Sequence, residues 1–204
     1  FIITFSNKQK MTQKAEIAVG FGILFIGLSS MSSSIGVYQD SPVFYKAFQV
    51  LGGNPILGIL VGAVVTAIIQ SSSASVGILQ TLAMRGIVNW RSAIFITLGQ
   101  NIGTCITAIL SSAGANKTAK RAAVIHLSFN VLGAAIYGVI MTIFFGIFPD
   151  LAMQHISSTQ ISIFHSIFNI SVTILLFPFA NALVKLSGSS RMISPDNFNN
   201  AFAN

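Results

Sequence analysis

A run of small polar residues, QSSSAS at positions 70–75, lies in the middle of a long apolar stretch. The flanking residues, 55–69 and 76–84, are mainly apolar. In a bilayer an unpartnered polar group costs several kcal/mol, so this segment must face protein, water or a ligand. Serine often packs between membrane helices, but Gln70 and three successive serines would cover every side of a helix. We therefore favour a binding site over a packing role.

The composition indicates an integral membrane protein. Of the 204 residues, 53% are hydrophobic and 7% are charged, whereas soluble domains carry about 25% charged residues. This length provides for roughly four to six membrane segments. A net charge of +7 would suggest a nucleic-acid partner in a soluble protein, but in a membrane protein cations gather in cytoplasmic loops. We therefore expect no nucleic-acid partner, and the single cysteine, Cys105, excludes an intrachain disulfide.

Apolar runs and turn signals divide the chain into segments. We expect a cytoplasmic lead-in at 1–14, transmembrane spans at 15–37, 92–111, 122–145 and 161–184, a helical hairpin at 55–84, and a polar cytoplasmic tail at 185–204. Asn54 and Pro55 suit the N-cap and the first turn of the hairpin's first helix. Pro178 is expected to kink the last span.

The basic residues favour a hairpin that enters and leaves on one side of the membrane. A single crossing at 55–84 would place most of the eleven Lys and Arg residues outside. The hairpin instead places eight of them inside: Lys8, Lys10, Lys14, Lys117, Lys120, Arg121, Lys185 and Arg191. Because cytoplasmic loops are enriched in Lys and Arg, we predict a re-entrant hairpin with its tip at residues 70–73. Both termini then lie on the cytoplasmic side of the cell (inner) membrane.

A second polar interruption, GQNIGT at residues 99–104, lies within the expected span 92–111. Two glycines on either side of an amide pair predict a locally broken helix, which is tolerated in a membrane where it lines a cavity. A packing groove made by the glycines is the simpler alternative. The adjacent amides of Gln100 and Asn101 favour a functional role.

No carboxylate is expected at the membrane centre. The acidic residues are Glu16, Asp40, Asp150 and Asp196, all at expected membrane edges or in loops. A central site must therefore use hydroxyls, amides, backbone carbonyls and helix ends. Na⁺ accepts such oxygen ligands, and helix N-termini attract anions. Because one half-helix ends near Gln70 and the next begins near Ser73, an anion and a cation can share the hairpin tip.

The sequence contains one short internal repeat, in which HLSFN at 126–130 matches HSIFN at 165–169. Each histidine precedes an asparagine by four residues, a spacing at which helical side chains meet. We interpret His126 and His165 as structural hydrogen-bonding residues. A hydrolase using a serine of QSSS would need a base and oxyanion donors in one place. Since no acid is placed to orient either histidine, we expect no enzymatic activity.

Four segments together resemble the type II sodium/phosphate cotransporter family, in particular its bacterial branch. They are QSSSA at 70–74, NIGT at 101–104, AKRAAVIHLSFN at 119–130, and FHSIFNI at 164–170 with LLFPF at 175–179. The resemblance runs from about residue 15 to residue 195. It implies an all-α membrane fold of two inverted repeats, each with a QSSS hairpin, and a substrate site between the hairpin tips. The chain resembles the second of these repeats.

The resemblance implies sodium-coupled symport of inorganic phosphate by alternating access. It assigns phosphate binding to Gln70, Ser71, Ser72, Ser73 and Asn101. It assigns sodium binding to Ser71, Ser73, Gln100, Asn101 and Thr104. Na⁺ is then the coupling ion, and no other cofactor or metal is implied. Cys105 stands where the family usually has a second threonine, which removes one hydroxyl ligand.

A chain that resembles one repeat needs a partner to complete such a site. We expect either the first repeat in the same parent chain or a second copy of this chain in a homodimer. The start at Phe1 favours a fragment. Two other functions fit the same residues: a carrier or channel for another anion, and a non-transporting assembly subunit.

Overall fold

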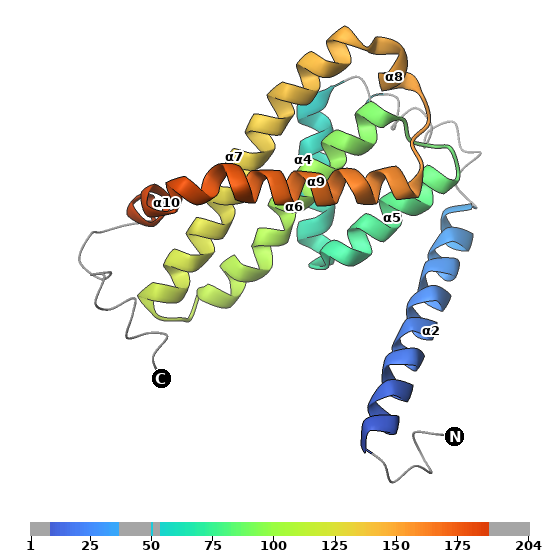
Figure 1. Ribbon diagram of the computed structural model, residues 1–204, viewed down its shortest axis with the longest axis horizontal. Coiled ribbons are helices and arrows are strands. Elements are labelled where there is room, and N and C mark those ends of the chain that lie inside the picture. The colour runs from blue at the N-terminus through green and yellow to red at the C-terminus, as the bar shows by residue number, and fades with distance from the viewer. Residues whose placement is uncertain (1–8, 37–49, 51–53, 188–204) are drawn as a thin grey trace.

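The computed structural model describes residues 9–36, 50 and 54–187, and these form helices without a β-strand (Figure 1). The helices are α2 (Gln9–Gly36), α4 (Pro55–Ile69), α5 (Ser72–Met84), α6 (Trp90–Ser112), α7 (Lys117–Ile147), α8 (Pro149–Met153), α9 (Ser158–Leu176), the 3-10 helix η1 (Phe177–Phe179) and α10 (Ala180–Leu186). Within the described part, the segments Trp90–Ser112, Lys117–Ile147 and Ser158–Lys185 are long and apolar enough to cross a membrane. The all-α membrane class is therefore confirmed.

Side-chain caps fix where several helices begin. The Asn54 side chain accepts hydrogen bonds from the backbone N–H groups of Ile56 and Leu57, with Pro55 in the first turn, as the sequence predicts. Asn89 forms a reciprocal capping box with Ser92 at the start of α6. These side chains replace the backbone partners that the first turn of a helix lacks.

The predicted hairpin segment forms two helices joined by a two-residue turn. Helix α4 ends at Ile69, and α5 begins at Ser72. The Thr66 and Ser75 hydroxyl oxygens lie 2.7 Å apart, so the two helices contact each other just behind the turn. The membrane topology of this hairpin stays a prediction. The expected lead-in and tail fall largely on residues 1–8 and 188–204, outside the described residues.

The predicted break at residues 99–104 is wrong, because α6 runs without interruption from Trp90 to Ser112. Gly99 and Gly103 instead let α6 approach α4 at backbone contact. A Cβ atom added at Gly99 would overlap the Ile59 carbonyl, and one added at Gly103 would lie 2.8 Å from the Thr66 side chain. The packing groove that small residues form between membrane helices therefore explains these glycines.

Helix α4 matches α6 with glycines of its own. Gly58 and Gly62 are buried, and a Cβ atom at Gly62 would overlap the Ile96 carbonyl. Both helices thus carry glycines at a four-residue spacing, G-x-x-x-G, on the faces that meet. This arrangement brings backbones close together in membrane helices.

Helix α9 crosses the other helices and contacts α5, α6 and α7 (Figure 1). On α7, Gly133 leaves room for Val172 of α9. The Tyr137 ring packs edge-on against Phe168 with centroids 5.0 Å apart, and its hydroxyl bonds Ser171. As the sequence predicts, the last apolar segment is interrupted at Pro178, where α9 gives way to η1. This crossing brings Ser162 of α9 to Gln80 of α5, and it brings His165 and Asn169 to a cavity that Ser72 also lines.

Candidate functional site

The turn between α4 and α5 consists of Gln70 and Ser71. Gln70 adopts a left-handed conformation (φ 56°, ψ 23°), and its backbone N–H donates to Thr66 O at 2.8 Å. Ser71 is extended, and its hydroxyl accepts a hydrogen bond from Ala74 N at 3.3 Å. The carbonyl end of α4 therefore lies beside the N–H end of α5. Such ends carry partial charges of opposite sign, so the turn offers groups for a cation and an anion.

Gln70 is the one residue other than glycine with a positive φ among those that the structure describes. For an L-residue this conformation costs about 1–2 kcal/mol, which glycine would avoid. Gln70, Ser71 and Ser73 are exposed. The turn therefore keeps an exposed amide at a position that favours glycine, as functional sites commonly do.

A buried polar cluster fastens the start of α5 to α4 and α6. Gln100 Nε2 of α6 donates to Ser75 O at 2.9 Å and to Ser75 Oγ at 3.0 Å. Ser75 Oγ in turn lies 2.7 Å from Thr66 Oγ1 of α4. Gln100 is 3% exposed, and its Oε1 has no protein partner. Gln100, assigned to sodium on the sequence, thus holds the hairpin in place through its amide nitrogen.

A cavity of about 290 Å³ lies between the first turn of α5 and helices α6, α7 and α9. It is lined by Ser72, Asn101, Thr104, His126, Phe129, Asn130, His165 and Asn169. All these side chains except Phe129 carry a hydrogen-bonding group, and none is a carboxylate. The cavity therefore offers neutral oxygen and nitrogen ligands directly behind the serine turn.

The three asparagines of the cavity are held in the same way. Asn101, Asn130 and Asn169 each donate from Nδ2 to the backbone carbonyl four residues earlier on the same helix, at 2.9, 2.9 and 2.8 Å. For Asn130 and Asn169 that carbonyl belongs to His126 and His165. The two halves of the internal repeat thus share one local geometry. In each half the asparagine side chain bonds the backbone carbonyl of the histidine and not its ring.

His165 links α9 to α6, because its Nε2 lies 3.2 Å from Asn101 Oδ1. Cys105 is fully buried, and its Sγ lies 3.6 Å from Asn101 O and from His126 O. The thiol therefore meets two backbone carbonyls and also the side chain of Asn130, which lines the cavity. Cys105 itself is not among the residues that line the cavity.

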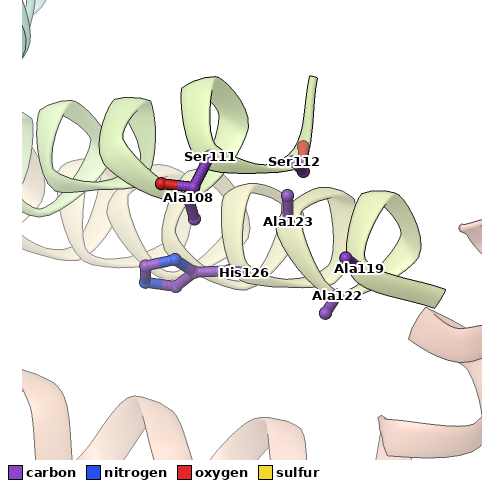
Figure 2. A pocket seen from close by; sticks show the side chains of 7 residues that line it. All are labelled: Ala108, Ser111, Ser112, Ala119, Ala122, Ala123 and His126. Carbon is purple, nitrogen blue, oxygen red and sulfur yellow. The ribbon is translucent and has the colours of Figure 1, made fainter. Parts of the chain in front are cut away.

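A second cavity, of about 370 Å³, lies between α6 and α7 near the loop that joins them (Figure 2). Small side chains line it: Ala108, Ser111, Ser112, Ala119, Ala122 and Ala123. Figure 2 shows the His126 ring projecting from α7 beside them. Because His126 also lines the first cavity, it stands between the two.

The structure brings some of the sequence-assigned residues together and separates others. Ser72, Asn101 and Thr104 line one cavity, whereas Gln70, Ser71 and Ser73 lie on the exposed turn. Four cavity residues were missed as site candidates: His126, Asn130, His165 and Asn169. The signal for them was present in the repeated H-x-x-x-N pattern. Their interpretation as structural residues rested on an expected location near the membrane ends, away from the serine turn.

Comparisons with known proteins point to one family. The model of the family described as Na⁺/Pi-cotransporter matches residues 41–172. The chain is 32% identical over 181 residues to the uncharacterized protein YqeW of Bacillus subtilis, covering 89% of this chain and 58% of that one. It is 24% identical over 179 residues to the putative inorganic phosphate export protein YjbB of Escherichia coli K12, covering 88% and 33%.

A mammalian protein matches over a shorter stretch. The chain is 33% identical over 131 residues to the sodium-dependent phosphate transport protein 2A of Rattus norvegicus, covering 60% of this chain and 21% of that one. The chain thus spans between about a fifth and three fifths of the length of these relatives. No solved structure matches.

Proposed function

The chain belongs to the Na⁺/Pi-cotransporter family, and from this premise we propose that it carries inorganic phosphate across the membrane together with sodium. The observation that carries the proposal is the meeting of the serine turn with the cavity. Ser72 at the start of α5 lines the same space as Asn101 and Thr104 of α6. These side chains provide hydroxyl donors for an anion and oxygen atoms for a cation.

Phosphate is proposed to bind at the first turn of α5. Ser71, Ser72 and Ser73 present hydroxyl groups there beside backbone N–H groups, and a helix N-terminus favours negative charge. The Gln70 amide, held exposed on the turn, adds a further donor. Sodium is proposed to bind to the oxygen atoms of the cavity, including those of Asn101 and Thr104.

Coupling follows from the absence of a carboxylate among the residues that line the cavity. A sodium ion about 4 Å from a phosphate charge contributes roughly 4 kcal/mol of attraction at an effective dielectric constant of about 20. That energy corresponds to a phosphate affinity about a thousandfold higher. We therefore propose that sodium binds first and converts a neutral cavity into an anion site.

The described geometry gives no support to a serine hydrolase. His165 is engaged with Asn101, and Ser71 accepts a backbone hydrogen bond as a helix cap. Among the described residues no serine of the turn is hydrogen-bonded to a histidine. The nucleophile–base pair that such an enzyme needs is thus not formed by these side chains.

A partner is part of the proposal, because the chain spans about half or less of most relatives that it matches. Either the first repeat in the same parent chain or a second copy of this chain would complete the site. We place the protein in the cell (inner) membrane with both termini in the cytoplasm, following the distribution of Lys and Arg. The runner-up function is a carrier or channel for another anion in the same cavity.

The test is uptake of labelled phosphate into liposomes that contain the purified chain, with a sodium gradient against a choline control. The full-length parent protein is assayed in parallel, so that a missing partner is distinguished from a wrong substrate. Sulfate and arsenate competition identifies the anion, and efflux from loaded liposomes identifies the direction. Equal uptake in sodium and in choline would refute sodium coupling.

A pair of glutamine variants tests the site itself. Gln70→Ala is expected to abolish uptake while membrane insertion is unchanged, because it removes the amide from the turn. Gln154→Ala is the matched control, since Gln154 is also exposed but lies at the end of α8. If Gln70→Ala retained uptake, a packing role for the serine turn would be favoured over a binding role.

A further inference from the structure

The hydrogen bonds of the three cavity asparagines determine which atom each presents. A carboxamide has a donor nitrogen and an acceptor oxygen on the same carbon. Because Nδ2 of Asn101, Asn130 and Asn169 donates to a backbone carbonyl, the reverse orientation would place two oxygen atoms against each other. Each amide nitrogen therefore uses one of its two hydrogens on the backbone, and each Oδ1 faces away from that carbonyl as an acceptor or a cation ligand.

His165 fixes one of these oxygens further. Asn101 Oδ1 can only accept a hydrogen bond, so the His165 Nε2 that lies 3.2 Å away must carry the hydrogen and donate it. This leaves the second lone pair of Asn101 Oδ1 for a ligand. The Asn130 side chain is also hydrogen-bonded to the Cys105 thiol, whereas for Asn169 the part of the chain that the structure describes provides no partner to Oδ1.

Asparagines from three helices therefore line one cavity: Asn101 of α6, Asn130 of α7 and Asn169 of α9. The hydroxyl-bearing residues Thr104 and Ser72 line the same space. Neutral oxygen ligands of this kind suit hard cations, whereas divalent cations are usually held by several carboxylates. Because no carboxylate lines the cavity, the chemistry favours a monovalent cation such as Na⁺.

We propose that helix α9 supplies part of a sodium site: Asn169 contributes an oxygen ligand beside Asn101 and Asn130, and His165 holds Asn101 in the ligating orientation. Asn169 and Asn130 occupy matching positions in the internal repeat, so each half of the repeat provides one ligand. The proposal deepens the proposed function, because it identifies residues of α7 and α9 that would bind the coupling ion.

The experiment measures sodium binding without phosphate. The purified 204-residue chain is heated in detergent with a thiol-reactive fluorescent dye, which reports unfolding when the single, buried Cys105 becomes accessible. A ligand that binds only the folded state raises the unfolding midpoint in proportion to the logarithm of its concentration once it is well above Kd. The wild-type midpoint is expected to rise with sodium and not with choline at equal ionic strength.

Four variants locate the site. Asn169→Ala and His165→Phe are expected to weaken apparent sodium affinity by roughly ten- to hundredfold, the range seen when groups that support a metal ion are removed. His165→Gln, which keeps an N–H donor, is expected to restore most of the affinity. Asn181→Ala, at an exposed position on α10, is the matched control and should bind sodium like the wild type.

The midpoint in choline reports folding, so a variant that merely loses stability is separated from one that loses sodium binding. Wild-type sodium affinity in Asn169→Ala, or no difference between sodium and choline in the wild-type chain, would overturn the site. A chain that binds sodium through Asn169 but carries no phosphate would overturn only the proposed function. The two failures are therefore distinguishable.

Discussion

The contact between α4 and α6 makes Gly99→Ala the sharpest test of the structure. A methyl group at Gly99 would overlap the Ile59 carbonyl oxygen and would lie 2.8 Å from Ile59 C and 2.9 Å from Ala63 N. Ordinary van der Waals contact begins at about 3.4 Å. The obstacles are backbone atoms, which cannot change rotamer, so relieving the overlap with the Ile59 carbonyl oxygen requires the two helices to separate by roughly 1.5 Å.

The free-energy change combines two opposing effects. Overpacking costs about 1–3 kcal/mol, and backbone obstacles place Gly99→Ala near the upper value, about 3 kcal/mol. Replacing a helical glycine by alanine returns up to about 1 kcal/mol. The net loss of unfolding free energy is therefore about 2 kcal/mol. At roughly 2–4 °C per kcal/mol for a chain of this size, the midpoint should fall by about 4–8 °C.

The assay is the thermal unfolding of purified protein, followed by dye labelling of Cys105, which is 0% exposed in the folded state. The matched control is Gly146→Ala in α7, where nothing lies within 4 Å of an added Cβ atom. This control should be unchanged or more stable by up to about 1 kcal/mol. If Gly99→Ala were as stable as Gly146→Ala, the reasoning about backbone contact between α4 and α6 would be refuted.

Three further predictions concern the turn and its surroundings. Gln70→Gly should raise the unfolding free energy by about 1 kcal/mol, because glycine adopts the left-handed conformation without strain. It should also abolish phosphate uptake, because it removes the amide. An unchanged thermal unfolding midpoint would contradict the strain at Gln70. Thr66→Val should lower the unfolding free energy by about 1 kcal/mol because it removes the buried hydrogen bond with Ser75. Thr66→Ser keeps a hydroxyl and should retain most of the stability. Equal unfolding midpoints for the two variants would count against a stabilising hydrogen bond. Cys105→Thr should leave the sodium concentration for half-maximal uptake within about twofold, a shift under about 0.5 kcal/mol, since Cys105 is not among the residues that line the cavity and a threonine hydroxyl can keep a hydrogen bond to Asn130. A larger shift in the uptake assay would make residue 105 a ligand.

The helical segments could be predicted from the sequence because their signals are local. The apolar run at 55–84 and its polar centre predict two helices and a turn, and the turn lies at Gln70 and Ser71 as expected. Asn54 caps the first helix as its position before a proline indicates. These features depend on neighbouring residues alone, so the sequence contains all the information they need.

The continuity of α6 could not be predicted from its own residues. Glycine lowers helix propensity, so Gly99 and Gly103 alone fit a break as well as they fit a close contact. The deciding information lies on α4, where Gly58 and Gly62 have the same four-residue spacing. Reading the two segments as a matched pair would have favoured close packing over a break.

The contribution of α9 to the site depends on tertiary structure. His165 meets Asn101 although 64 residues separate them. No local pattern indicates that α9 lies beside the cavity that Ser72 lines. The repeated H-x-x-x-N pattern indicates that His126 and His165 have similar surroundings. That both line the cavity depends on the direction in which α9 crosses the other helices.

The backbone contact between α4 and α6 also limits how the molecule can move. Where these two helices touch through glycines and carbonyl groups, the contacting atoms cannot change rotamer, so we expect the helices to shift together as one rigid body. The interface with α9 is made of side chains, including the His165–Asn101 hydrogen bond and the Tyr137–Phe168 ring contact. For the function proposed above, opening and closing of the cavity would therefore proceed by displacement of α9 against a fixed α4–α6 unit, and a probe pair across α9 and α6 would test for that displacement.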